Sequence, residues 1–149
     1  MPRLSDTQTS KRTVLFVCTH NSARSQMAEG LLRARYGDRF EVESAGTEPG
    51  SVHPLAVEAM RERGIDIGAQ TSKHVDEVVE ARTFDIVVTV CDSAREACPY
   101  VPAKDEHLHR SFPDPSAAPG TRDEILDVFR DVRDAIAAWI DHTFGEGPH

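Results

Sequence analysis

The sequence lacks the features by which membrane, secreted and nucleic-acid-binding proteins are recognised. No unbroken apolar run exceeds six residues, far short of the roughly 20 residues that span a bilayer. No apolar stretch of signal-peptide length follows Lys11 and Arg12, so we expect no secretory signal. Only 17 Lys and Arg stand against 25 Asp and Glu, and the net charge of −8 disfavours nucleic acids and anionic membranes. We therefore expect a cytoplasmic protein with no nucleic-acid or membrane partner.

Cysteine is also scarce, at three residues in 149. An odd number without an export signal argues against a framework of structural disulfides. No C-x2-C pair or zinc-type histidine pair accompanies the cysteines, so we expect no metal site. By number alone, Cys18, Cys91 and Cys98 are buried thiols that pack as small hydrophobic side chains.

The apolar pattern predicts strands that alternate with helices. Apolar runs or alternation predict strands at 13–18, 40–45, 84–90 and, less apolar, 106–112. Helical periods predict helices after the first strand to about Gly37, and at 53–63, 75–81 and 121–144. This alternation is typical of an α/β domain with a parallel sheet and helices on both faces. We expect one domain at 13–144, a disordered tail at 1–12 and a loose tail at 145–149.

A loop between the first strand and the next helix has the composition of an oxyanion site. It runs from Cys18 to Arg24 and Ser25 with five residues between the cysteine and the arginine. Such a loop aims backbone N–H groups at one point, arginine adds a planar fork of donors, and this positive environment favours a thiolate. We expect the Ser25 hydroxyl to bond that thiolate. The expected substrate-binding residues are Arg24 and the five between: Thr19, His20, Asn21, Ser22 and Ala23. The alternative is an ordinary surface loop, and we expect His20 to be exposed there.

The segment Cys18–Gly30 resembles the phosphate-binding loop of the low-molecular-weight protein tyrosine phosphatase superfamily, and most closely that of its arsenate reductases. The similarity covers about residues 13–144, including 43–46, 53–54, 71–73, 88–99 and 112–115. It implies a three-layer α/β fold with a four-stranded parallel sheet flanked by helices. It implies arsenate as substrate, with phosphate or sulfate as mimics, and a monomer.

An aspartate between two prolines is the candidate acid. The prolines on either side of Asp114 restrict the backbone, so the carboxylate is positioned rather than mobile. By itself the motif is also typical of a plain Asp-Pro turn. The resemblance implies that Asp114 is the general acid that protonates the departing oxygen.

The remaining cysteines distinguish a reductase from a phosphatase. If residues 91–98 are helical, Cys91 and Cys98 lie about 10.5 Å apart along the axis. A disulfide needs Cα atoms within about 7 Å, so a bond between them requires unwinding. The resemblance to thioredoxin-coupled arsenate reductases implies a thiol sequence from Cys18 through Cys91 to Cys98. It implies electrons from thioredoxin and no bound cofactor.

Two alternatives remain: a phosphatase acting through a phosphorylated Cys18, and a non-catalytic oxyanion or redox sensor. Tyrosines that often follow Pro115 in the phosphatases are absent, since Ser116 and two alanines stand there.

Some members of the superfamily bind potassium behind this loop. The matching positions here are Asn21, Glu29 and Ser44, and Lys73 stands where those members have an aspartate. The hypothesis is that the Lys73 ammonium replaces the cation beside Asn21 and Glu29. The alternative is a solvent-facing lysine.

Overall fold

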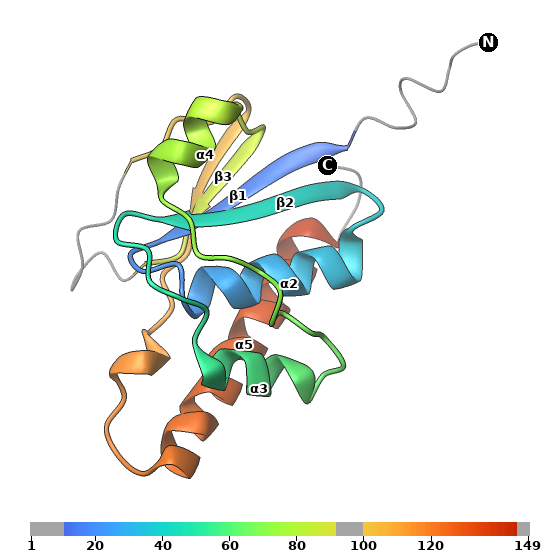
Figure 1. Cartoon of the computed structure of the whole chain (residues 1–149). Coiled ribbons are helices and arrows are strands. Elements are labelled where there is room, and N and C mark those ends of the chain that lie inside the picture. The colour runs from blue at the N-terminus through green and yellow to red at the C-terminus, as the bar shows by residue number, and fades with distance from the viewer. Residues whose placement is uncertain (1–10, 92–99, 146–149) are drawn as a thin grey trace.

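The computed structural model describes residues 11–91 and 100–145, and within them four parallel strands form one sheet in the order β2-β1-β3-β4 (Figure 1). The strands are β1 (Arg12–Cys18), β2 (Phe40–Gly46), β3 (Ile86–Thr89) and β4 (Glu106–His109). The expected α/β fold with a four-stranded parallel sheet is confirmed.

Helices cover both faces of this sheet. They are α2 (Arg24–Tyr36), α3 (Pro54–Arg61), α4 (Val75–Ala81), the short 3₁₀ turn η1 (Pro115–Ala117) and α5 (Arg122–Phe144). Helices α2, α3 and α5 lie on one face and α4 on the other (Figure 1). No helix in the described parts of the chain is long and apolar enough to cross a membrane.

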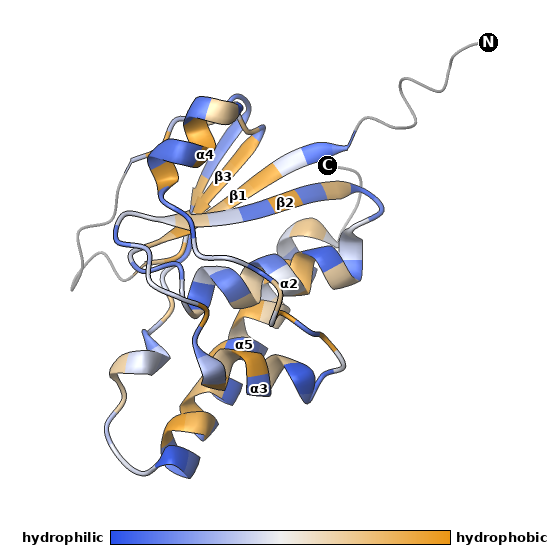
Figure 2. Cartoon of the chain, in the orientation of Figure 1, coloured by the Kyte–Doolittle hydropathy of each residue, from blue (hydrophilic) through white to orange (hydrophobic). Residues whose placement is uncertain are grey.

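Strand β1 is apolar on both faces because it is a central strand between two hydrophobic layers (Figure 2). Val14 and Phe16 pack in the cluster that includes α2, α3 and α5, whereas Leu15 and Val17 pack in the cluster that includes α4. Since side chains alternate along a strand, Cys18 belongs to the α2 face. The period of the strand therefore places the cysteine against the start of α2.

Several element boundaries differ from the sequence prediction, among them the start of β3 at Ile86 rather than residue 84 and the end of α3 at Arg61 rather than residue 63. Strand β1 starts at Arg12, which pairs with Phe40, so this residue is not part of the expected tail. Strand β4 ends at His109, three residues before the expected end at Phe112. Backbone hydrogen bonds to the end of β3 continue beyond His109, since the Arg110 N–H donates to the Thr89 carbonyl at 3.0 Å and the Phe112 N–H to the Val90 carbonyl at 3.3 Å.

Candidate active site

The candidate loop connects the carboxyl end of β1 to the first residue of α2, as expected. Cys18 is the last residue of β1, and Arg24 is the first of α2. Gly46 of β2 lies against the loop so closely that an added Cβ would be 2.5 Å from the Thr19 oxygen and 2.9 Å from the Asn21 nitrogen. A residue without a side chain is therefore required there for the loop to pack on β2.

The loop carbonyls point outward. The Thr19 carbonyl accepts from the Glu48 N–H at 2.8 Å, and the His20 carbonyl accepts from the Gly50 N–H at 3.1 Å. The Asn21 carbonyl accepts from the Gln26 side-chain amide at 3.0 Å, and the Ser22 carbonyl accepts from the His53 N–H at 2.8 Å. Each trans peptide directs its N–H opposite to its C=O, so the N–H groups of residues 20–23 turn to the inside of the loop. Successive N–H groups aimed inward form a concave site suited to an anion.

Asn21 stabilises this loop from within. Its φ of 50° lies in the left-handed region, which asparagine tolerates better than most residues. The Lys73 N–H donates to Asn21 Oδ1 at 2.8 Å, which fixes the orientation of the amide. Asn21 Nδ2 then donates to Ser25 Oγ at 2.8 Å and to Ser44 Oγ at 2.9 Å.

These bonds bear on the contact between Ser25 Oγ and Cys18 Sγ, which is 2.9 Å long and in which either atom could be the donor. Because Ser25 Oγ already accepts from the Asn21 amide, its own O–H is available to donate to the sulfur. A donated hydroxyl stabilises the thiolate form of Cys18, which is the nucleophilic form. Both Cys18 and Ser25 are buried, so this bond is shielded from water.

The same network continues to Glu29. Ser44 Oγ donates to Glu29 Oε1 at 2.5 Å, and Arg33 pairs with Glu29 Oε2 at 2.6 Å. Lys73 differs from its expected role, because its ammonium donates to the Thr71 carbonyl at 3.1 Å. Lys73 reaches Asn21 through its backbone N–H, and the cation bonded to Glu29 is Arg33.

Arg24 and Asp114 are brought together from distant parts of the chain. The Arg24 side chain is 2% exposed, and its guanidinium lies 3.7 Å from Asp114 Oδ2 and 3.3 Å from the Phe112 carbonyl oxygen. Asp114 caps η1, where its Oδ1 accepts from the N–H and the hydroxyl of Ser116 at 3.0 and 2.6 Å. One carboxylate oxygen is therefore held by the turn while the other faces the arginine.

Cys91 leaves the sheet beside Cys18. Thr89 of β3 is in register with Val17 of β1, and the Val90 N–H donates to the Val17 carbonyl at 2.9 Å. Neighbouring parallel strands lie about 4.8 Å apart, so the residues that follow them start from adjacent positions. Cys91 is fully buried and disulfide-bonded, whereas Cys18 is a free, buried thiol.

The expected helix between the second and third cysteines covers residues 92–98. This segment, with Cys98, lies outside the described residues.

The backbone of Cys91 is held by a group that the sequence prediction missed. Ser111 Oγ donates to the Cys91 carbonyl at 3.2 Å, and His109 Nε2 contacts Ser111 Oγ at 3.0 Å. His109 Nδ1 in turn lies 2.7 Å from Thr89 Oγ1.

Two histidines border the loop. The ring of His20 is exposed, and its Nδ1 contacts the Glu48 carbonyl at 3.2 Å. His53 caps α3 by accepting the Leu55 N–H at Nδ1, and its ring packs 4.7 Å from that of Phe129. The sequence pointed to His53 as a helix start but not to its position beside the loop.

Among residues 11–91 and 100–145, no three His, Cys, Asp or Glu side chains are grouped so that they could hold a metal ion.

Comparison with known proteins finds a matching family model and similar sequences over most of the chain. A family model described as low molecular weight phosphotyrosine protein phosphatase matches residues 13–143. The arsenate reductase of Halalkalibacterium halodurans is 47% identical over 137 residues, which make up 92% of this chain and 97% of that protein.

Solved structures are similar over most of the chain. One, an arsenate reductase in the phosphate binding state, has a TM-score of 0.71 at 32% identity and covers 91% of this chain and 98% of its own. The thioredoxin-dependent arsenate reductase of Corynebacterium glutamicum has a TM-score of 0.64 at 28% identity and covers 93% of this chain and 65% of its own.

Proposed function

Because the chain belongs to the low molecular weight phosphotyrosine protein phosphatase family, we propose that it reduces arsenate to arsenite with Cys18 as the nucleophile and thioredoxin as the electron donor. The relatives named above, at up to 47% identity over most of the chain, are arsenate reductases. The observation that carries the catalytic assignment is a buried Cys18 sulfur, 2.9 Å from the Ser25 hydroxyl, at the base of a loop of inward N–H groups.

The first step joins sulfur to arsenic. The N–H groups of residues 20–23 and the Arg24 guanidinium bind the oxygens of arsenate, and the Cys18 thiolate attacks the arsenic. Asp114 lies beside Arg24 with one oxygen held by Ser116, so it is placed to donate a proton to the oxygen that leaves as water.

The second step transfers two electrons. The Cys91 thiolate, which is set free when the disulfide of Cys91 is reduced, attacks the Cys18 sulfur; the electron pair of the sulfur–arsenic bond passes to arsenic, and arsenite leaves. The new Cys18–Cys91 disulfide is attacked by Cys98, which frees Cys18, and thioredoxin reduces the disulfide that remains. The positions of Cys18 and Cys91 on adjacent strand ends support this order.

The alternative function is hydrolysis of phosphate monoesters through a Cys18 phospho-intermediate. This reaction would use the same loop and acid but would need neither Cys91 nor Cys98. A non-catalytic oxyanion or redox sensor would bind arsenate without turning it over.

A coupled assay tests these functions together. With arsenate, thioredoxin, thioredoxin reductase and NADPH, we expect NADPH consumption that is lost in Cys18→Ser, Cys91→Ser and Cys98→Ser. In a single turnover, Cys98→Ser should release one arsenite per protein and stop as a Cys18–Cys91 disulfide, detectable by mass spectrometry of the digested protein. Cys91→Ser should release none.

Omission of thioredoxin is the control for each reaction. Normal turnover by Cys98→Ser with thioredoxin would contradict the role of the third thiol, since thioredoxin would then reduce the Cys18–Cys91 disulfide directly. Turnover with a glutaredoxin- or mycothiol-type reductant but not with thioredoxin would assign the electron supply to that system. Hydrolysis of p-nitrophenyl phosphate by all variants that retain Cys18, without arsenite formation, would favour the phosphatase.

A further inference from the structure

A buried carboxylate lies at the end of the hydrogen-bond network that reaches Cys18. Glu29 is 4% exposed, and one of its oxygens accepts the Ser44 hydroxyl at 2.5 Å. A carboxylate removed from water in this way is stable only with a partner of opposite charge or with its proton retained. That partner is Arg33, one helical turn further along α2, at 2.6 Å from the second oxygen.

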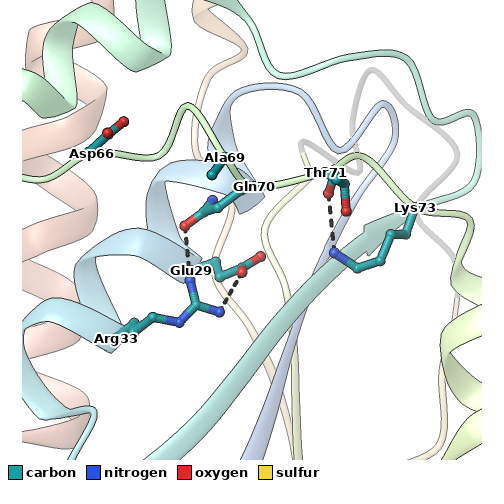
Figure 3. A pocket seen from close by; sticks show the side chains of 7 residues that line it. All are labelled: Glu29, Arg33, Asp66, Ala69, Gln70, Thr71 and Lys73. Carbon is teal, nitrogen blue, oxygen red and sulfur yellow. Dashed lines mark hydrogen bonds and ion pairs between the residues drawn. The ribbon is translucent and has the colours of Figure 1, made fainter.

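Arg33 is held in this position from both sides. Its guanidinium donates to the Gln70 side chain and to the Val42 carbonyl, each at 3.0 Å. The Arg33 side chain is 49% exposed and lines a cavity of about 350 Å³ together with Gln70, Thr71 and Lys73 (Figure 3). The positive charge therefore reaches the buried Glu29 from the solvent side of the molecule, behind the loop.

We propose that Arg33 is a positioning residue for the Cys18 nucleophile, because it supplies the counter-charge that keeps Glu29 as the acceptor at the end of the chain Glu29–Ser44–Asn21–Ser25–Cys18. This inference rests on the proposed function only in taking Cys18 as the nucleophile. It assigns a role in thiol reactivity to a residue on the wall of the cavity, outside the oxyanion loop.

The sign of the effect follows from charge. If Arg33 is removed, two cases arise. In the first, Glu29 keeps an unbalanced negative charge, which disfavours a second negative charge on Cys18. In the second, Glu29 takes up a proton or turns toward the cavity. In that second case Ser44 loses its acceptor and the Asn21 amide is less well ordered. Both outcomes reduce the fraction of Cys18 present as a hydrogen-bonded thiolate.

The test measures the reactivity of Cys18 itself, without arsenate. In a Cys91→Ser, Cys98→Ser background Cys18 is the single cysteine of the chain. We expect Arg33→Gln to alkylate with iodoacetamide about fivefold more slowly near neutral pH, and the rates to converge at high pH where every thiol is ionised. Arg33→Lys, which keeps the charge, should stay close to the parent.

Two further variants make the result specific. Arg35→Gln makes the same change of charge on the same helix but removes the ion pair with Asp141, and it should leave the rate unchanged. Arg33→Gln combined with Lys73→Gln excludes compensation by the other cation that lines the cavity.

A charge-coupled role also predicts non-additivity. In a Glu29→Gln background, which leaves no carboxylate to balance, Arg33→Gln should have little further effect on the alkylation rate. An alkylation profile of folded Arg33→Gln that matches the parent at every pH would overturn the proposal, as would an equal loss in the Glu29→Gln background. Circular dichroism confirms that each variant is folded. Since no arsenate is used, this outcome is separate from a failure of the reductase assay.

Discussion

Asn21 shows how much of the site depends on one side chain. Its backbone takes the left-handed turn of the loop, and its amide connects three separate segments, through Lys73, Ser25 and Ser44. The Lys73 N–H fixes which end of the amide donates. As a consequence, the Ser25 hydroxyl accepts from the Asn21 amide and keeps its own O–H to donate to the thiolate form of Cys18.

Titration of His53 makes the stability of the folded chain depend on pH. Its pKa is lowered because the ring is partly buried, and the negative charge of Asp114 offsets this only in part. A folded-state pKa below the unfolded value of about 6.5 means that protonation favours the unfolded chain. The stability that neutral His53 contributes is therefore fully present above about pH 6.5, and it is lost as the pH falls through the lower pKa of His53 in the folded state.

We expect His53→Asn to reduce this loss. Asparagine can still cap α3 by accepting the Leu55 N–H, but it does not titrate. The urea midpoint of the variant should change less than that of the parent between about pH 7 and about pH 5. His107→Asn, at an exposed position of β4, is the control. An unchanged pH dependence in His53→Asn would show that other groups cause the loss.

Helix α5 is held in place at both of its ends. It begins at a capping box in which the Thr121 side chain accepts from the Glu124 N–H and the Glu124 side chain accepts from the Thr121 N–H. Its last residue, Phe144, is buried 5.2 Å from the ring of Phe40 on β2 and 5.8 Å from that of Trp139. The end of the helix thus packs on an edge strand of the sheet.

Removal of the Phe144 ring should destabilise the folded protein. We expect Phe144→Ala to lower the free energy of unfolding by about 3–5 kcal/mol, because it leaves a cavity among aromatic rings. Chemical denaturation followed by circular dichroism measures the change. Asp131→Ala, on an exposed face of the same helix, should change it by less than about 0.5 kcal/mol. A loss below about 1 kcal/mol in Phe144→Ala would mean that the helix end contributes little.

The molecule as a whole carries a net charge of −8, the sign that repels an arsenate dianion. Attraction therefore depends on the local donors of the loop, which act at contact distance. Salt screens the distant charges most, since the Debye length falls from about 30 Å at 0.01 M to about 10 Å at 0.1 M.

We expect the KM for arsenate to fall about twofold over that range, with kcat unchanged. Steady-state kinetics in sodium chloride measures this, and a parallel series in sodium acetate separates screening from competition by chloride. A KM that rises in both salts would show that the field of Arg24 outweighs the net charge of the surface.

Local sequence determined the elements and the nucleophile loop. Continuous apolar runs predicted the central strands, periods of three and four predicted α5, and the spacing from Cys18 to Arg24 predicted a loop between a strand and a helix. These features follow from neighbours in the chain, and the structure places β1, α2 and α5 within a residue or so of the prediction. Asp114 was singled out by its two prolines, and it faces Arg24.

Only the tertiary structure decided which groups meet across the chain. The spacing of Glu29 and Arg33 by one helical turn allows an ion pair. Glu29 requires this partner only because the fold buries its carboxylate beside Ser44 of β2. The ammonium of Lys73 donates to the Thr71 carbonyl, two residues away, rather than to the groups beside Asn21 and Glu29. The hydrogen-bond network behind Cys18, too, depends on contacts between residues far apart in sequence, which no local pattern encodes.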